Sequence, residues 1–331
     1  MATLTLPAPV TLPFPASAVP RTYRAPRFQL KRDRSADRPD VWSLEIVRGC
    51  SFGIVYMAGE REPVSLAEGA AEQLDKELAY RREKPRVVQL GRHSDPLQPL
   101  PDVQAEVGRV VEVLARRGVV AWLCTRGMAL PALREILIEQ RRLVRVSVSL
   151  LTLEQDVQRV VEPNAPTTEQ RLRQLADFRR LQIPVEVNLD PLLPGLTDTR
   201  ASLEPMLERL ADLGVERVTA GYLVLRPGVK ECIRQVLEPA GWSELVVSAY
   251  FDGQALRDGP NPPAVFLSKF KRQRGYASLM SLAAGFGLEA RLSGAANPDF
   301  RPPRRPDAAS AARARAMLKA VRQSAMTAVG A

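Results

Sequence analysis

Residues that commonly build metal sites and disulfides are scarce in this chain, which has three cysteines and one histidine among 331 residues. Three cysteines cannot form a full disulfide framework, which favours a reducing, cytoplasmic compartment. The single histidine, His93, cannot form a His-based metal site alone, and no Ser–His–Asp triad is evident. No apolar run approaches the roughly 18–20 residues that span a bilayer, and no secretory signal is recognisable. We therefore expect a cytoplasmic protein with no membrane partner.

Positive charge is concentrated at the two ends of the chain, whose formal net charge is +10. Residues 1–40 hold seven Lys/Arg and three Asp, a net of +4. Residues 296–331 hold seven Lys/Arg and two Asp, a net of +5. The ends are interpreted either as solvated tails or as two basic arms that contact nucleic-acid phosphates.

Short apolar runs alternate with amphipathic stretches in the middle of the chain. The expected strands cover residues 44–47, 86–90, 119–124, 144–150, 185–189 and 217–225. The expected helices cover residues 66–80, 103–116, 130–141, 168–180, 200–213 and 229–237. This alternation implies right-handed βαβ units, and six of them predict an α/β fold, a partial (β/α)6 TIM-like barrel. A doubly wound sheet has the same local pattern and is the alternative.

Composition divides the chain into four regions. Residues 1–40 are rich in proline and arginine and are expected to form a disordered arm. Residues 41–240 are expected to form the barrel, and residues 241–295 a helical C-terminal extension. Residues 296–331 form a basic, largely disordered tail, within which residues 308–329 have the composition of a weak Ala-rich helix.

The segment from Arg48 to Met57 carries the most informative motif, which reads Arg-Gly-Cys-Ser-Phe-Gly-Ile-Val-Tyr-Met. It resembles the Arg-Gly-Cys-x-x-x-Cys-x-Tyr-Cys segment of radical S-adenosylmethionine (SAM) proteins, in the branch related to spore photoproduct lyase. Cys50 stands at the first cysteine position of that motif. Ile54 and Met57 stand at the second and third.

Further pieces of the chain resemble the same family in the same order. They are Gly91 to Pro99, the pair Thr125-Arg126, Ser147-Val148-Ser149, Glu162 to Pro166 followed by Arg171-Leu172, and Pro191 to Asp198. Each follows or lies on an expected strand. Together they imply the radical SAM barrel over roughly residues 43–240, with N- and C-terminal extensions.

The resemblance implies a cofactor that the chain is not equipped to hold. In the family, three cysteine thiolates bind a [4Fe–4S] cluster, and its fourth iron binds the amine and carboxylate of SAM. Thiolates suit iron because they are soft and negatively charged, whereas isoleucine has no lone pair and the methionine thioether is neutral. We therefore expect no cluster at this loop. Cys50 is interpreted as a remnant metal ligand, a reactive thiol or a small apolar filler.

Four residues are candidates for a retained SAM or nucleoside pocket. Asp95 either faces the pocket, as in the family, or caps the next element. Ser147 and Ser149 point the same way along one strand and either bind a ligand carboxylate or satisfy hydrogen bonds inside the barrel. Arg171 lies early on a helix and is either a carboxylate clamp or a solvated charge.

A second candidate site is the densest basic segment outside the tails. It comprises Lys269, Lys271, Arg272 and Arg274, with Phe270 and Tyr276 interleaved. Aromatic rings among cations suit base stacking and phosphate pairing. The alternative is an exposed helix start with both rings tucked inward.

Three functions remain open from the sequence. The first is a pseudoenzyme on a radical SAM scaffold that acts by binding a ligand. The second is an active radical SAM enzyme, similar to a lyase, with an atypical iron–sulfur site. The third is a nucleic-acid-binding protein built on the same scaffold. Fold alone does not choose among them.

Overall fold

The computed structural model describes residues 21–23, 30–32, 41–60, 63–257, 262–299 and 316–317. Most of the two expected arms, and most of the expected Ala-rich helix, lie outside these residues. No helix within the described part is long and apolar enough to cross a membrane.

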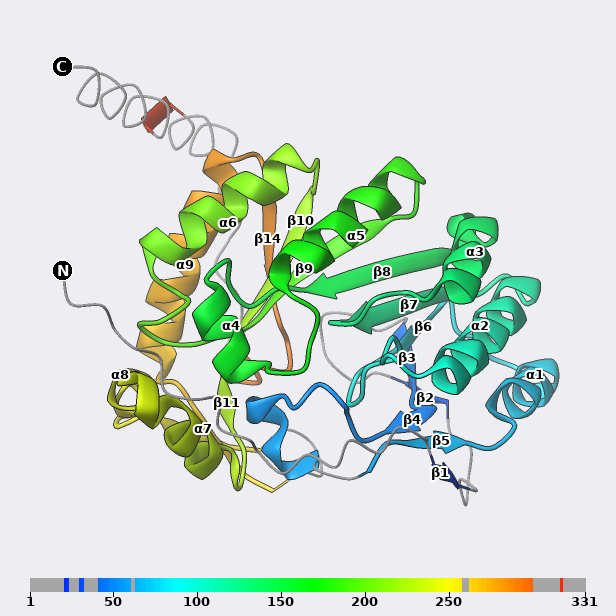
Figure 1. Ribbon diagram of the computed structural model, residues 1–331, viewed down its shortest axis with the longest axis horizontal. Helices are drawn as coiled ribbons and strands as arrows, with labels where there is room; N and C mark the ends of the chain where they lie inside the picture. Colours follow the sequence, from blue (N-terminus) through cyan, green and yellow to red (C-terminus); the bar gives the residue numbers. More distant parts are fainter. Residues whose placement is uncertain are drawn as a thin grey trace.

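The molecule is organised around an eight-stranded sheet (Figure 1) with the order β14-β10-β9-β8-β7-β6-β3-β2. The central strands are β3 (Val41–Leu44), β6 (Val87–Leu90), β7 (Val120–Thr125), β8 (Val144–Ser149), β9 (Val185–Leu192) and β10 (Arg217–Tyr222). From β3 to β10 neighbouring strands are parallel and follow each other in sequence order. β2 (Lys31–Arg32) is an antiparallel edge.

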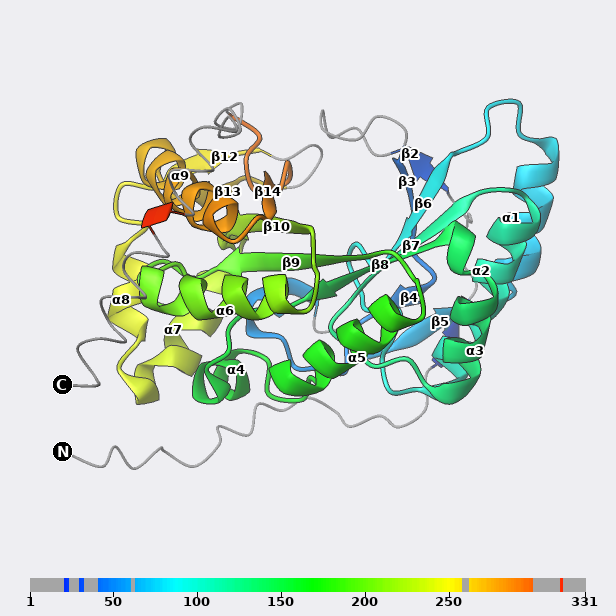
Figure 2. The same ribbon diagram turned by 90° about the horizontal axis from the view of Figure 1, so that it is seen from above.

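Helices cover the convex face of this sheet (Figure 2). They include α2 (Pro101–Arg116), α3 (Pro131–Glu139), α5 (Thr168–Arg180) and α6 (Arg200–Asp212). The strands from β3 to β10 lie side by side in the order of the sequence, and the helices lie on one face of the sheet. This arrangement is an open partial barrel, because in a doubly wound sheet the strand order reverses and helices cover both faces. The predicted fold class is confirmed.

Burial alternates along most of β9, whose convex face packs against helices, whereas β8 is buried on both faces from Val146 to Ser149. Val146, Val148 and Val187 are buried on the convex face with exposures of 0–1%. On the concave face Asn188 and Thr219 are only partly buried. Polar side chains on this face therefore sit inside the open barrel, where a ligand would meet them.

Several boundaries differ from the prediction. The first barrel strand ends at Leu44 instead of Val47, because Val47–Arg48 forms β4 and pairs with β5 (Ser65–Ala67) in a separate small sheet. The pairing of β5 delays the start of α1 to Ala70–Tyr80. A short helix, α4 (Gln155–Val161), was not expected.

The region 241–295, expected to be a helical extension, is only partly helical. This region contains α8 (Ser243–Ser248), β12 (Gln254–Leu256), β13 (Ala264–Phe266), α9 (Lys269–Gly285) and β14 (Glu289–Leu292). β14 pairs in parallel with β10 and so extends the barrel sheet beyond the six predicted strands. β12 and β13 form another small sheet with β11 (Val224–Leu225), next to α7 (Val229–Leu237).

Candidate functional site at the mouth of the barrel

The loop that carries Cys50 is tightly turned and packed. Gly49 and Gly53 adopt φ values of 72° and 67°, a left-handed conformation that glycine tolerates. The loop leads into η1 (Val55–Glu60). Ile54 is 4% exposed, and Met57 packs against the main core. The two residues at the second and third cysteine positions therefore fill space as apolar side chains.

The donor set of this loop does not match an iron–sulfur cluster. Cys50 is the one thiol among the three positions. Burial, reinforced by the nearby charge of Asp95, raises the pKa of Cys50 to about 12, so the group is a neutral thiol near pH 7. Among the described residues, no group of three His, Cys, Asp or Glu side chains is placed to hold a metal ion.

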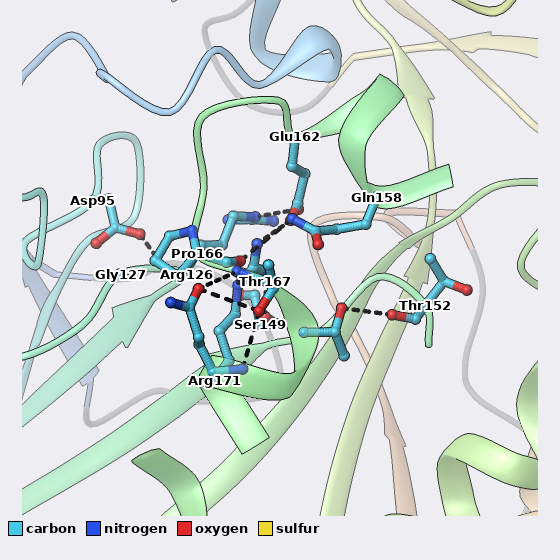
Figure 3. Close-up of polar contacts among 12 residues, drawn as sticks. Asp95, Arg126, Gly127, Ser149, Thr152, Gln158, Glu162, Pro166, Thr167 and Arg171 are labelled. Carbon is cyan, nitrogen blue, oxygen red and sulfur yellow. Dashed lines mark hydrogen bonds and ion pairs between the residues drawn. The ribbon is translucent and has the colours of Figure 1, made fainter. Parts of the chain in front are cut away.

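Beside this loop lies a buried ionic network centred on Glu162 (Figure 3). One carboxylate oxygen of Glu162 accepts hydrogen bonds from the Tyr56 hydroxyl (2.5 Å) and from Arg126 Nε (3.0 Å). The other oxygen accepts from Arg171 Nη2 at 2.5 Å. The side chains of Glu162 and Arg171 are 1% and 0% exposed. Burial alone would raise the pKa of Glu162, but the two arginines hold it below its usual range.

The network joins segments that are distant in sequence. Tyr56 belongs to η1, Arg126 follows β7, Glu162 follows α4, and Arg171 lies on α5. Arg126 Nη2 also donates to the carbonyl of Asp190 on β9, at 3.0 Å. The guanidinium of Arg126 thus links loops from successive βα units at the C-terminal ends of the strands, where barrel enzymes place their chemistry.

The Asp95 carboxylate links the loop after β6 to the end of β7 by hydrogen bonds. This carboxylate accepts hydrogen bonds from Leu97 N (2.8 Å), from Thr125 Oγ1 (2.6 Å) and from Arg126 N (2.6 Å). The side chain is 6% exposed, and burial raises its pKa. These hydrogen bonds hold the turn after β6 against the end of β7.

The other predicted pocket residues also bond within the protein. Ser147 is 0% exposed, and its hydroxyl accepts a hydrogen bond from Trp122 Nε1 at 2.8 Å. Arg171 donates to the carbonyls of Ser149 and Pro166, both at 2.9 Å, as well as to Glu162. Arg171 is therefore not the solvated charge that the sequence offered as one alternative, and the carboxylate that it binds here is that of Glu162.

Sequence reasoning did not single out Asp190, an acidic group on the concave face of the sheet whose pKa is raised. Asp190 lies near the end of β9 and is partly buried, and burial raises the pKa of its carboxyl to about 6 against the opposing charges of Arg126 and Arg226. A hydrogen bond with the Ser293 side chain stabilises the ionised form. Ser293 follows β14, so this arrangement depends on a strand that was not predicted. The one indication in the sequence was that an acidic residue, Asp190, directly follows the expected strand 185–189.

Some residues of the predicted basic site are buried and others are exposed. Arg272 is 0% exposed and donates to the Leu267 carbonyl (2.7 Å), Asn297 Oδ1 (3.0 Å) and Asp299 Oδ2 (2.8 Å). Tyr276 is also 0% exposed. These two residues were wrongly assigned to a nucleic-acid surface, because they face the interior of the protein. Lys269 and Arg274 remain exposed.

Comparison with known proteins supports the fold more strongly than any function. No protein-family model matches the chain. An uncharacterized protein of Acidianus two-tailed virus is 27% identical over 180 residues, 54% of this chain and 58% of the viral protein. An uncharacterized protein of Mycobacterium tuberculosis (strain H37Rv) is 31% identical over 150 residues, 45% of this chain and 43% of that protein. The chain spans about half the length of the curated relatives that it matches.

Solved structures show which type of fold the chain adopts. The fold is a partial barrel of the radical SAM type. Spore photoproduct lyase complexed with a dinucleoside spore photoproduct superposes with a TM-score of 0.65 over 82% of this chain and 80% of that one, at 10% identity. A mutant of that lyase with bound S-adenosylmethionine and the same photoproduct gives 0.66 with the same coverage and identity. At this identity the likeness concerns the fold alone.

Proposed function

We propose that this chain is a radical SAM-fold protein that assembles no [4Fe–4S] cluster at the Cys50 loop and acts by binding. The observation that carries the proposal is the packing of Ile54 and Met57 where the resemblance requires two thiolates. The neutral Cys50 thiol supports it further, because the thiolate is the form that binds iron. The radical chemistry of the fold depends on its cofactor, so a protein without the cluster keeps the scaffold alone.

Anaerobic reconstitution with iron and sulfide tests this proposal. We expect the purified chain to hold no stoichiometric cluster and to show no reducible visible chromophore. The matched control is the double variant Ile54→Cys with Met57→Cys, which restores three cysteines at the family spacing while Gly49 and Gly53 keep the turns. We expect partial cluster uptake by this variant. Near-stoichiometric iron and sulfide in the natural chain would overturn the proposal and favour an active enzyme with an atypical site.

Any retained SAM site would be weak on this proposal. The family holds the amino-acid part of SAM through iron, and here Asp95, Ser147 and Arg171 bond to other protein groups. Without the iron chelate we expect SAM to bind in the micromolar-to-millimolar range, about −8 to −4 kcal/mol. Calorimetry with SAM and S-adenosylhomocysteine measures this, and sub-micromolar binding would contradict it.

Nucleic-acid binding is a second candidate function, favoured by a specific observation. Phe251 and Phe270 are 96% and 72% exposed, and Lys269 and Arg274 lie exposed in the same region. The terminal regions add most of the net positive charge. The structural neighbour described in complex with a dinucleoside photoproduct supports this candidate by analogy only. Binding whose affinity falls steeply with salt would agree with it, because phosphate contacts release counterions.

A further inference from the structure

Two phenylalanines stand out on the surface formed by α8, α9 and the turn between α8 and β12. Phe251 is 96% exposed and Phe270 is 72% exposed. Large aromatic side chains are mostly buried in folded proteins, and rings this exposed are informative when they occur together. Both rings lie far from the Cys50 loop in sequence and belong to the region added after the predicted barrel.

The two backbone segments that carry these rings are held together. Lys271 Nζ donates to the Ala249 carbonyl at 2.8 Å and to Asp252 Oδ1 at 2.6 Å, which ties the first turn of α9 to the turn around Phe251. Tyr250 is 7% exposed, and its hydroxyl donates to the Leu223 carbonyl. Figure 1 shows α8 beside the start of α9. Phe251 and Phe270 therefore project from adjoining, anchored segments.

Two exposed cations lie on α9 beside Phe270. Arg274 lies one helical turn after Phe270, on the same face of α9, and is exposed. Within the described part of the chain Arg274 has no hydrogen-bond or ion-pair partner. Lys269 is exposed and donates to the carbonyl of Asp299 at 3.3 Å, so its positive charge is not neutralised by that contact. Both side chains can reach a bound anion without breaking an internal ion pair.

The basic C-terminal region begins at this same surface. Arg272 holds Asn297 and Asp299 against α9, so the described chain reaches Asp299 beside Lys269. Residues 300–331 then contain seven Lys/Arg and one Asp, a net of +6. In the sequence, positive charge therefore continues beyond Asp299, the last described residue beside α9.

We infer that the surface formed by Phe251, Lys269, Phe270 and Arg274, the α8–α9 surface, binds single-stranded nucleic acid. Exposed ring faces stack on unpaired bases, and the neighbouring cations pair with the phosphates between them. A duplex keeps its bases stacked internally and offers these rings little contact. This inference rests on the nucleic-acid candidate function proposed above and places the contact outside the mouth of the barrel.

Fluorescence anisotropy with the full chain tests the inference. The probe is a labelled oligothymidine of about 20 nucleotides, longer than the ~4–16-nucleotide sites of single-strand-binding folds. Phe251→Ala and Phe270→Ala should each weaken binding about tenfold, in line with the loss of one stacked base. Tyr80→Ala is the matched control, because Tyr80 is 89% exposed on α1, and it should leave binding unchanged. Circular dichroism establishes that each variant is folded.

A second set of variants tests the contribution of positive charge. It consists of Lys269→Ala and Arg274→Ala, with Arg116→Ala on the exposed face of α2 as the control. Each of the first two should weaken binding and lower the slope of log affinity against log salt by about 1. A labelled duplex of the same length should bind more weakly than the single strand, and polyglutamate should compete poorly.

The outcomes separate the inference from the function on which it rests. If the full chain binds neither single strand nor duplex, the nucleic-acid candidate itself fails. If the single strand binds and both phenylalanine variants match the natural chain, nucleic-acid binding stands and the α8–α9 surface is overturned. Equal displacement by polyglutamate, or a preference for duplex that the phenylalanine variants do not change, also overturns it.

Discussion

The network around Glu162 and the α8–α9 surface use the same kinds of residue in opposite ways. Around Glu162, the side chains of Arg171 and Arg126 are 0% and 17% exposed, and both pair with an internal carboxylate. At the α8–α9 surface, Phe270 and Phe251 are mostly exposed, and Arg274 has no such carboxylate among the described residues. Arginine and aromatic residues stabilise the fold in the first region and remain accessible to a partner in the second. A basic or aromatic motif alone does not distinguish the two uses.

The strongest test of this contrast is Glu162→Ala. The substitution leaves Arg126 and Arg171 without their shared carboxylate, and we expect the free energy of unfolding to fall by about 3–5 kcal/mol. Urea denaturation measures the change. Glu139→Ala on the exposed face of α3 is the control and should change stability by less than about 0.5 kcal/mol. A loss below about 1 kcal/mol for Glu162→Ala would show that the buried network contributes little.

The buried side of α9 provides the next test. Alanine normally stabilises a helix interior relative to glycine by about 0.5–1 kcal/mol. At Gly275, however, an added Cβ would lie 1.8 Å from the hydroxyl oxygen of Tyr222. We expect Gly275→Ala to destabilise the protein by about 1–3 kcal/mol through overpacking, measured by thermal or urea unfolding. The Tyr222→Phe background should reduce that loss, and stabilisation by Gly275→Ala alone would contradict the close approach.

The raised pKa of Asp190, at the mouth of the barrel, predicts that the free energy of unfolding depends on pH. The pKa is raised from 3.8 to about 6 in the folded protein, so folding favours the protonated carboxyl. The stability that this group contributes is present below about pH 4 and is lost as pH rises through about 6. Asp190→Asn should therefore be more stable than the natural chain above pH 6, by up to about 3 kcal/mol, and equal to it near pH 4. Urea unfolding at several pH values measures this, and a difference independent of pH would contradict it.

The smallest effect on stability is expected at the α8–α9 surface. Phe251→Ala and Phe270→Ala should each change the free energy of unfolding by less than about 0.5 kcal/mol, because the rings bury little area. The same urea measurements used for Glu162→Ala provide the comparison. A loss above about 1 kcal/mol would show that these rings pack in solution, which would weaken their assignment as a binding surface.

Much of the barrel was predictable because the pattern that indicates each strand or helix lies within that segment of the sequence. Apolar runs and amphipathic stretches located the strands from β6 to β10 and most helices to within a few residues. β14 was not predictable in the same way. Its sequence, Glu-Ala-Arg-Leu, is short and half polar, and it becomes a strand because β10 presents an unpaired edge beside it. Pairing between distant segments has no signature inside either segment.

The candidate sites were predicted less well than the fold, for a related reason. Asp95, Ser147 and Arg171 were found from the motifs, but their hydrogen-bond partners come from other loops and strands. In the basic segment of α9, Arg272 and Arg274 look alike in sequence. The first is buried against Asn297 and Asp299, and the second is exposed.

The sequence by itself determined the order of strands and helices, and it determined that Cys50 stands alone at three cysteine positions. Both follow from residue identity and short-range pattern. Only the tertiary structure decided which charges are internal and which rings are exposed. Burial depends on segments that are distant along the chain, such as Glu162 between Arg126 and Arg171, and a charge removed from water persists only where such a partner meets it.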